Sequence, residues 1–228
     1  MRKGKLIIRI IGILALSLGL LFLLLPTFFQ QRFVQTTRKL EQNFTEKEES
    51  VQSDALYEFL KAENERLYAE KQKDLKDPFS YEIPGINLSA FGITDNLIGF
   101  LTIPRIEETL PLYLGANEQN MTKGAVHLTQ TSYPIGGNNT NVVIAAHRGY
   151  YQANMFRHID KLEIGDNVYI KNFRETLTYQ VVETKIINPD AINEVLIREQ
   201  RDMITLLSCH PYMYNYKRYV VYCERVNN

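Results

Sequence analysis

Three residue types that suit covalent catalysis stand close together in the stretch "TLLSCHPYMYNYKR", residues 205–218. Cys209 closes an apolar run and is soon followed by Pro211, which ends a strand because proline has no backbone donor. A side chain at the end of a strand is held by the sheet and still reaches a substrate. Cys209 is therefore a candidate nucleophile, although a lone cysteine packs equally well in a core.

The second cysteine, Cys223, lies in the middle of "RYVVYCERV". We expect it to be buried among core side chains, because cysteine outside disulfides is among the most buried residue types. A Cys209–Cys223 disulfide would suit an exported protein, but it would silence the thiol. Nothing in the sequence places the two residues at bridging distance.

A nucleophilic thiol needs a proton-transfer partner and a group that stabilises the oxyanion. His127 and His147 each end an apolar strand before a polar loop. Both are candidate partners, and both also fit a hydrogen-bonded core histidine. His210 adjoins the cysteine and should point to the opposite face, while His158 lies in "NMFRHIDKL", a predicted short helix, as a surface residue.

Arg218 follows Cys209 by nine residues and begins the next predicted strand. A hairpin of that length brings its guanidinium beside the thiol, where a fork of donors suits a carbonyl oxygen or an oxyanion. Lys217 should point the other way. The sequence offers no Cys/His cluster for a metal, so we expect neither a metal nor a cofactor.

The second half of the chain is mainly β. Short runs rich in Val, Ile, Thr and Tyr are separated by Gly, Pro, Asn and Asp, which predicts eight strands in a sandwich or a closed barrel. The runs are "LIGFLTIP", "LPLYLG", "AVHL", "NVVIAAH", "NVYIKN", "LTYQVVETKII", "DMITLLSC" and "RYVVYCERV".

The N-terminus carries an apolar run from Ile10 to Phe29 without a charged residue. This is long enough for a helix to cross a hydrocarbon core of about 30 Å. A cleaved signal peptide is the alternative, which the length and the lack of a small-residue cleavage site disfavour. We expect one uncleaved span with a cytoplasmic N-terminus, because Arg2, Lys3, Lys5 and Arg9 all precede it.

The chain divides into four regions. Residues 1–30 form a cytoplasmic tip and membrane anchor, 31–76 a helical stalk, 77–96 a loop, and 97–228 the β domain. The stalk is dense in Glu, Lys and Gln, and we expect solvated helices, with partial disorder as the alternative for 34–52. The net charge of zero gives no reason to expect nucleic acid as a partner.

These features together resemble the sortases, cysteine transpeptidases of Gram-positive surfaces. The resemblance runs from about Ile98 to Val226 and rests on "TLLSC" with its later arginine, the histidine of "AAHRG", "YPIGGNNTN" and "MFRHIDKLEIGD". "IPRIEETLPLYLGA" and "TLLSCHPY" make it most similar to the class C, pilus-assembling group. The resemblance implies an eight-stranded sortase β-barrel with Cys209, His147 and Arg218 converging in a groove.

The resemblance also implies a reaction. Cys209 attacks an LPxTG-like sorting signal between Thr and Gly, His147 protonates the leaving amine, and Arg218 holds the oxyanion. An amine then resolves the thioester; it is a pilin lysine in pilus assembly or a peptidoglycan-precursor amine in wall anchoring. The family has Thr before the cysteine, where this chain has Ser208, a candidate substrate-binding residue whose hydroxyl is kept.

Class C members often carry a lid with an Asp-Pro-aromatic motif, which "DPF" at Asp77, Pro78 and Phe79 resembles. The simpler reading is a turn that ends the preceding helix. Two other functions fit the same residues. One is a cysteine peptidase that passes the acyl group to water, and the other is a non-catalytic surface scaffold in which Cys209 only packs.

Overall fold

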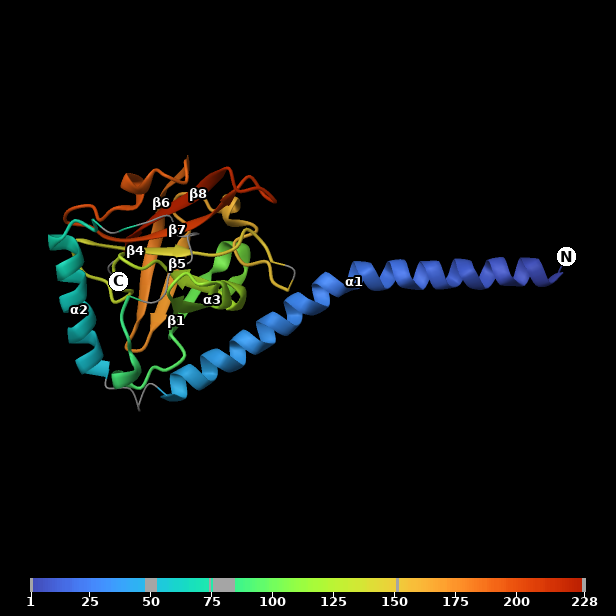
Figure 1. Ribbon diagram of the computed structural model, residues 1–228, viewed down its shortest axis with the longest axis horizontal. Helices are drawn as coiled ribbons and strands as arrows, with labels where there is room; N and C mark the ends of the chain where they lie inside the picture. The colour runs from blue at the N-terminus through green and yellow to red at the C-terminus, as the bar shows by residue number, and fades with distance from the viewer. Residues whose placement is uncertain (1, 48–52, 74, 76–84, 151, 227–228) are drawn as a thin grey trace.

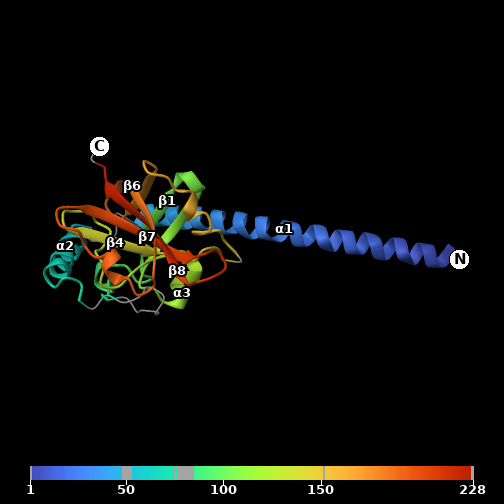
Figure 2. The same cartoon turned by 90° about the horizontal axis from the view of Figure 1, so that it is seen from above.

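The computed structural model describes residues 2–47, 53–73, 75, 85–150 and 152–226. A rounded β domain carries one long helix that projects far beyond it (Figure 1). Viewed from above, the inner half of that helix still lies along the domain, and its N-terminal end is the most distant point of the molecule (Figure 2).

Eight strands close into one barrel in the order β1-β2-β3-β4-β7-β8-β6-β5, which confirms the predicted fold. The pairs β2/β3 and β4/β7 are parallel, and the other neighbours are antiparallel. The strands are Leu97–Ile103 (β1), Glu108–Leu114 (β2), Ala125–His127 (β3), Thr140–Ala145 (β4), Asn167–Asn172 (β5), Thr176–Ile187 (β6), Asp202–His210 (β7) and Lys217–Arg225 (β8).

The central strands are buried on both faces. On β7, Ile204 and Leu206 belong to one buried cluster, while Met203 and Leu207 belong to the other. Such strands read as continuous apolar runs rather than as strict alternation, as "MITLL" does. The hairpin of β7 and β8 is therefore anchored on two sides, and its end is a rigid place for a functional side chain.

Helix α1 (Arg2–Lys47) is one continuous helix with Pro26 near its middle. It changes direction about midway (Figure 1), as expected where a proline removes one helical hydrogen bond. Its apolar side chains up to Phe28 are largely exposed. The segment Ile7–Glu46 is long and apolar enough to be a candidate membrane span.

The inner half of α1 and helix α2 (Ser53–Ala69) pack on the barrel, so the expectation of solvated stalk helices is wrong for one face of each. The Phe44 ring meets Phe100 of β1 edge-on at 5.5 Å. Leu56, Leu60 and Leu67 of α2 are at most 2% exposed. The stripe of leucines is sparse, but burying each leucine against the barrel removes its whole side chain from water, which drives the docking.

Two short elements differ from the prediction. The segment "NMFRHIDKL" contains no α-helix, because Met155 has a left-handed φ of 48° that an α-helix cannot include. It forms turns and a 3-10 helix, η5 (Ile159–Lys161). An unpredicted helix α3 (Glu118–Lys123) begins where the Asn117 side chain accepts a hydrogen bond from the Asn120 N–H at 2.9 Å.

The remaining 3-10 helices are single turns in connections: η3 (Ser89–Phe91), η4 (Pro104–Ile106) and η6 (Ile192–Val195).

Candidate active site

Cys209 and Arg218 face each other across the β7/β8 hairpin. The two residues are cross-strand partners, and the next pair along the ladder is His210 with Lys217. Cys209 is half-buried at the penultimate position of β7. The predicted hairpin therefore places Arg218 beside Cys209.

His147 reaches the same place from β4. Because β4 runs parallel to β7 with Ala145 paired to Leu207, the residues that follow advance together. The Ala146 N–H continues this ladder by donating to the Leu207 carbonyl at 3.3 Å. Two residues beyond the end of β4, the histidine thus stands alongside Cys209.

One open cavity of about 440 Å³ receives both side chains. Its rim is the loop between β7 and β8, where Tyr212, Met213, Tyr214 and Tyr216 are 43–83% exposed. These large side chains leave a partly apolar patch exposed at the mouth of the cavity. The cavity is lined by His147, Arg148, Gly149, Cys209, Tyr212, Met213, Tyr214, Asn215 and Tyr216.

Burial lowers the pKa of His147 below that of an exposed histidine. Its ring stacks on the ring of Tyr150 at 5.5 Å with an interplanar angle of 12°. Its carbonyl accepts a hydrogen bond from the Phe156 N–H at 3.0 Å. The histidine is thus fixed through its backbone and one ring face, and its neutral form is favoured at neutral pH.

His127 lies elsewhere, in the core. It is 1% exposed, and its Nε2 lies 3.1 Å from the Ser132 carbonyl and 3.2 Å from the Thr131 carbonyl. Burial lowers its pKa to about 4. Of the two histidines that the sequence left as alternatives, the structure brings His147 to the thiol and gives His127 the hydrogen-bonded core position.

Arg218 is 5% exposed and does not line the cavity. Its Nη1 donates to the Asn215 carbonyl at 2.9 Å and to the Lys217 carbonyl at 3.2 Å. In this structure the guanidinium therefore holds the base of the β7/β8 loop. Lys217 points away, as predicted, and its Nζ donates to Asn188 Oδ1.

Ser208 does not line the cavity either. It is fully buried, and its hydroxyl donates to the Ala146 carbonyl at 2.8 Å. This bond ties the end of β7 to the residue that precedes His147. The predicted contact of Ser208 with substrate stays a prediction, and the contact that the structure shows for its hydroxyl is with the backbone before His147.

Sequence reasoning missed Arg148, although it stands in the quoted "AAHRG". Its side chain is 5% exposed and pairs with Asp160 at 2.9 Å. It also donates to the Arg157 carbonyl at 3.1 Å and to the Cys209 carbonyl at 3.4 Å. The sequence signal that could have found it is its place directly after a candidate histidine at the end of an apolar strand, whereas its burial is visible only in the structure.

The other predicted site features have simple outcomes. Cys223 is fully buried, and the two cysteines are not joined by a disulfide. Asp77 and Phe79, the proposed lid residues, lie outside the described residues. Among the residues that the structure describes, no group of three or more His, Cys, Asp and Glu side chains is placed to hold a metal ion.

Fold and site define a class: a closed β-barrel protein with a thiol, a histidine and an arginine gathered where β4, β7 and β8 meet. A model of the Sortase domain matches residues 101–226, and the chain belongs to the sortase family, a family of enzymes.

Curated relatives agree with this assignment. Sortase D of Bacillus subtilis is 30% identical over 136 residues, which cover 58% of this chain and 66% of that protein, just under two thirds. Sortase A of Bacillus anthracis is 28% identical over 173 residues, 76% of this chain and 77% of that protein.

Similar solved structures are class C sortases, in agreement with the resemblance seen in the sequence. Sortase C of Streptococcus pneumoniae has a TM-score of 0.69 and 31% identity, covering 87% of this chain and 96% of that one. Sortase C1 of Streptococcus agalactiae has a TM-score of 0.70 and 32% identity, covering 85% and 95%.

Proposed function

We propose that this chain is a membrane-anchored transpeptidase. It cleaves an LPxTG-like sorting signal between Thr and Gly and joins the new acyl end to an amine. The observation that carries the proposal is the meeting of Cys209 and His147 in one open cavity. A thiol nucleophile and an imidazole at neighbouring strand ends suit acyl transfer through a thioester.

In the first half-reaction, the Cys209 thiolate forms a bond to the threonine carbonyl carbon. The bond from that carbon to the glycine nitrogen breaks, and His147 as imidazolium gives its proton to the departing nitrogen. The oxyanion that forms in between needs donors, and Arg218, the cross-strand partner of Cys209, is the proposed one. This role requires the guanidinium to turn one of its donors towards the cavity.

In the second half-reaction, an amine attacks the thioester carbonyl and gives up its proton to His147. The Cys209 sulfur leaves as thiolate, and an amide bond has replaced the one that was cut. The exposed aromatic rim of Tyr212, Tyr214 and Tyr216 supports a peptide substrate with apolar residues, as the Leu-Pro of a sorting signal provides.

The amine is a pilin lysine in this proposal. A solved structure of Streptococcus pneumoniae Sortase C, similar to this chain over most of its length, is described as informative on pilin substrate specificity. The second candidate is wall anchoring, with an amine of a peptidoglycan precursor as the acceptor. Release of the acyl group to water would make the enzyme a peptidase.

The membrane is the proposed location. The exposed apolar half of α1 crosses it, with the N-terminus in the cytoplasm because Lys5 and Arg9 lie on that side. The barrel then stands on the outer face, where surface-protein substrates and their amine partners are found.

The test combines the full chain with a sorting-signal peptide and a primary amine, and identifies products by mass spectrometry. We expect a peptide ending in Thr joined to the amine, and a thioacyl adduct on Cys209. Cys209→Ala should abolish both, whereas Cys223→Ala should keep most activity because Cys223 is buried within a strand. A free threonine carboxylate would establish the peptidase instead, and joining by Cys209→Ala would reject the nucleophile.

A further inference from the structure

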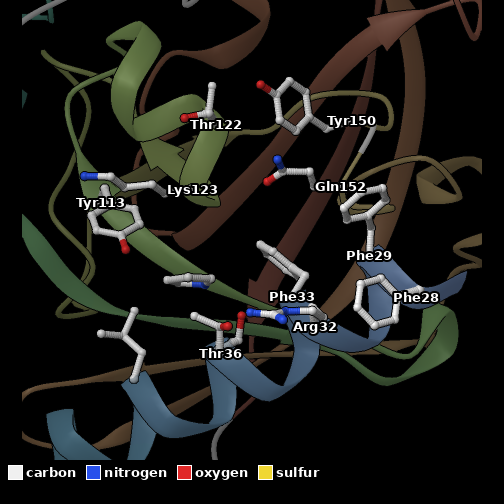
Figure 3. Close-up of a pocket in the computed structure, with 13 residues that line it drawn as sticks. Phe28, Phe29, Arg32, Phe33, Thr36, Tyr113, Thr122, Lys123, Tyr150 and Gln152 are labelled. Carbon is white, nitrogen blue, oxygen red and sulfur yellow. The ribbon is translucent and has the colours of Figure 1, made fainter. Parts of the chain in front are cut away.

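A second and larger cavity, of about 710 Å³, lies between α1 and the barrel (Figure 3). Arg32 and Phe33 approach it from α1, while Thr122 of α3 and Tyr150 stand on the opposite side. The function described above makes no use of it. The cavity is lined by Phe28, Phe29, Arg32, Phe33, Thr36, Thr37, Leu40, Pro111, Tyr113, Thr122, Lys123, Tyr150 and Gln152.

The lining combines aromatic rings with positive charge. Arg32 lies over the Phe28 ring at 5.9 Å, and Lys123 lies over the Tyr113 ring at 5.8 Å. All thirteen lining residues are described, and none of them is acidic. A cavity with two cations, no anions and several rings suits a ligand that carries a negative charge next to an apolar part.

The position of the cavity along α1 narrows the choice of ligand. Phe28 and Phe29 are the last residues of the apolar run that begins at Ile10, and Arg32 follows within one helical turn. Aromatic and basic side chains concentrate where a membrane-spanning helix leaves the hydrocarbon for the headgroups. The cavity therefore stands at the headgroup level of any membrane that α1 crosses.

We propose that this cavity binds the headgroup of an anionic phospholipid. Arg32 holds the phosphate from α1, Lys123 adds positive charge from the opposite side of the cavity, and Phe28, Phe29 and Phe33 contact the glycerol and the first acyl carbons. The proposal rests on the membrane anchoring proposed above but not on the transpeptidase reaction. It commits to a lipid of the surrounding membrane, because a phospholipid carries its negative charge next to apolar chains at the level where α1 enters the bilayer.

The site has a direct contact with the catalytic groups. Tyr150 lines the lipid cavity and also stacks on the ring of His147 at 5.5 Å. A bound headgroup therefore packs against a side chain that orients the histidine. It also fills the space between α1 and the barrel, which holds the barrel close to the membrane surface.

The test uses the delipidated full chain in a neutral detergent and titrates short-chain lipids by native mass spectrometry. The probes are dihexanoyl phosphatidylglycerol, dihexanoyl phosphatidylcholine and glycerol 3-phosphate. We expect one phosphatidylglycerol per chain, bound about tenfold more tightly than the other two. Arg32→Gln and Lys123→Gln should each weaken it by about fivefold, since one cation near a membrane surface is worth about that factor.

Arg38→Gln is the matched control, because it removes the same charge from the same helix outside the cavity. We expect it to bind phosphatidylglycerol like the unchanged chain. If Arg38→Gln and Arg32→Gln weaken phosphatidylglycerol binding equally, the cavity is not the binding site. Equal affinity for phosphatidylglycerol and phosphatidylcholine would also contradict the proposed site. Glycerol 3-phosphate binding as tightly as the lipid would overturn the lipid as its ligand. Acylation of Cys209 by a sorting peptide is measured on the same samples. A chain that is acylated but binds no lipid contradicts the lipid site alone, and a chain that binds lipid but is not acylated contradicts the enzymatic proposal alone.

Discussion

At the scale of single residues, burial works against the charged form of His147, which the proposed reaction needs. Its pKa is lowered by desolvation, so the imidazolium is the minor form at neutral pH. Stacking on Tyr150 fixes the ring but adds no charge that would offset the desolvation. A substrate that develops negative charge at the thiol or the carbonyl oxygen would restore the charged form when it is needed.

The first prediction concerns the histidines. His147→Ala should lower the acylation rate by about a hundredfold to ten-thousandfold, the usual contribution of a general acid. His210→Ala and His158→Ala should be tolerated, because neither residue lines the thiol cavity. The measurement is the rate of thioacyl formation with a sorting-signal peptide, alongside the thermal midpoint. A His147→Ala enzyme that acylates at the normal rate would remove this residue from the mechanism.

The local pattern could not choose between His127 and His147, because each ends an apolar strand before a polar loop, and only the resemblance to the sortases pointed to His147. The choice depends on strand pairing. His127 ends β3, and its ring is enclosed by the loop at Thr131 and Ser132, whereas His147 follows the strand that runs parallel to β7. The relation of His147 to Cys209 cannot be read from local spacing, because β4 and β7 are far apart in the chain.

The second prediction concerns Arg218. If it supplies directed donors to a carbonyl oxygen, Arg218→Ala should acylate roughly a hundredfold more slowly or worse, as when other oxyanion donors are removed. Arg218→Lys should recover only part of the rate, because lysine keeps the charge and loses the planar fork. Lys217→Ala, on the opposite face, is the control and should matter little.

Arg218 also holds the Asn215 and Lys217 carbonyls, so thermal midpoints must accompany these rates. A variant that loses stability but acylates normally would show that Arg218 serves the loop alone. The opposite result, slow acylation in a stable protein, supports the proposed contact with substrate.

At the scale of elements, the site depends on two parallel neighbours. β4 and β7 are far apart in the chain but paired in register, so His147, two residues beyond β4, lies near Cys209, the penultimate residue of β7. Ser208 links them, since its buried hydroxyl donates to the Ala146 carbonyl at 2.8 Å. The histidine is thus positioned through the backbone of its predecessor.

The third prediction tests that link. Ser208→Ala leaves the buried Ala146 carbonyl without this donor, which should cost about 1–3 kcal/mol of unfolding free energy. It should also lower the acylation rate about tenfold or more, because small displacements of a catalytic group are costly. Ser208→Thr restores the hydroxyl and should restore the rate.

Ser132→Ala is the matched control, because Ser132 is equally buried, and its hydroxyl oxygen accepts a hydrogen bond from the Asn141 N–H. It should reduce stability without a comparable effect on acylation. If both alanine variants lower acylation equally, the effect is one of general stability, and Ser208 has no special role.

The strands were predictable because each is a short run of strand-forming residues bounded by turn residues. The helical errors have local causes. Met155 adopts a left-handed backbone that its residue type does not announce, and the six residues of α3 are too few to show a period. The leucine stripe of α2 did predict a helix, but spacing alone does not reveal that the barrel covers that face.

At the scale of the whole molecule, polar side chains join α1 to the barrel. Gln30 Nε2 donates to Glu108 Oε1 of β2 at 3.1 Å, and the Asn154 N–H donates to Gln30 Oε1 at 2.8 Å. Further along, Lys171 of β5 donates to the hydroxyl of Thr45 at 2.6 Å. Because these contacts begin just after the apolar run of α1, they set how the barrel stands relative to a membrane.

Glu108 is the titratable member of this contact. Burial raises its pKa to about 7, against smaller lowering effects from Asn154, Gln30 and Arg157. Its folded pKa thus lies above the ordinary value for an unfolded chain of about 4.3. The folded state therefore binds this proton more tightly, and the resulting stability is present below the unfolded pKa and is lost as pH rises through the folded pKa.

The last prediction follows from this loss of stability with rising pH. Glu108→Gln keeps a hydrogen-bonding group towards Gln30 but carries no charge at any pH. Relative to the unchanged chain, it should gain thermal stability as pH rises from about 5 to about 8, across the range between the unfolded and folded pKa of the carboxyl. Glu107→Gln alters the neighbouring exposed carboxyl, which is only the smallest of the effects on the pKa of Glu108, and should show at most a small trend. If the difference in thermal stability between Glu108→Gln and the unchanged chain is the same at both ends of this range, Glu108 does not titrate in the contact. The docking of α1 on the barrel then does not depend on pH through this residue.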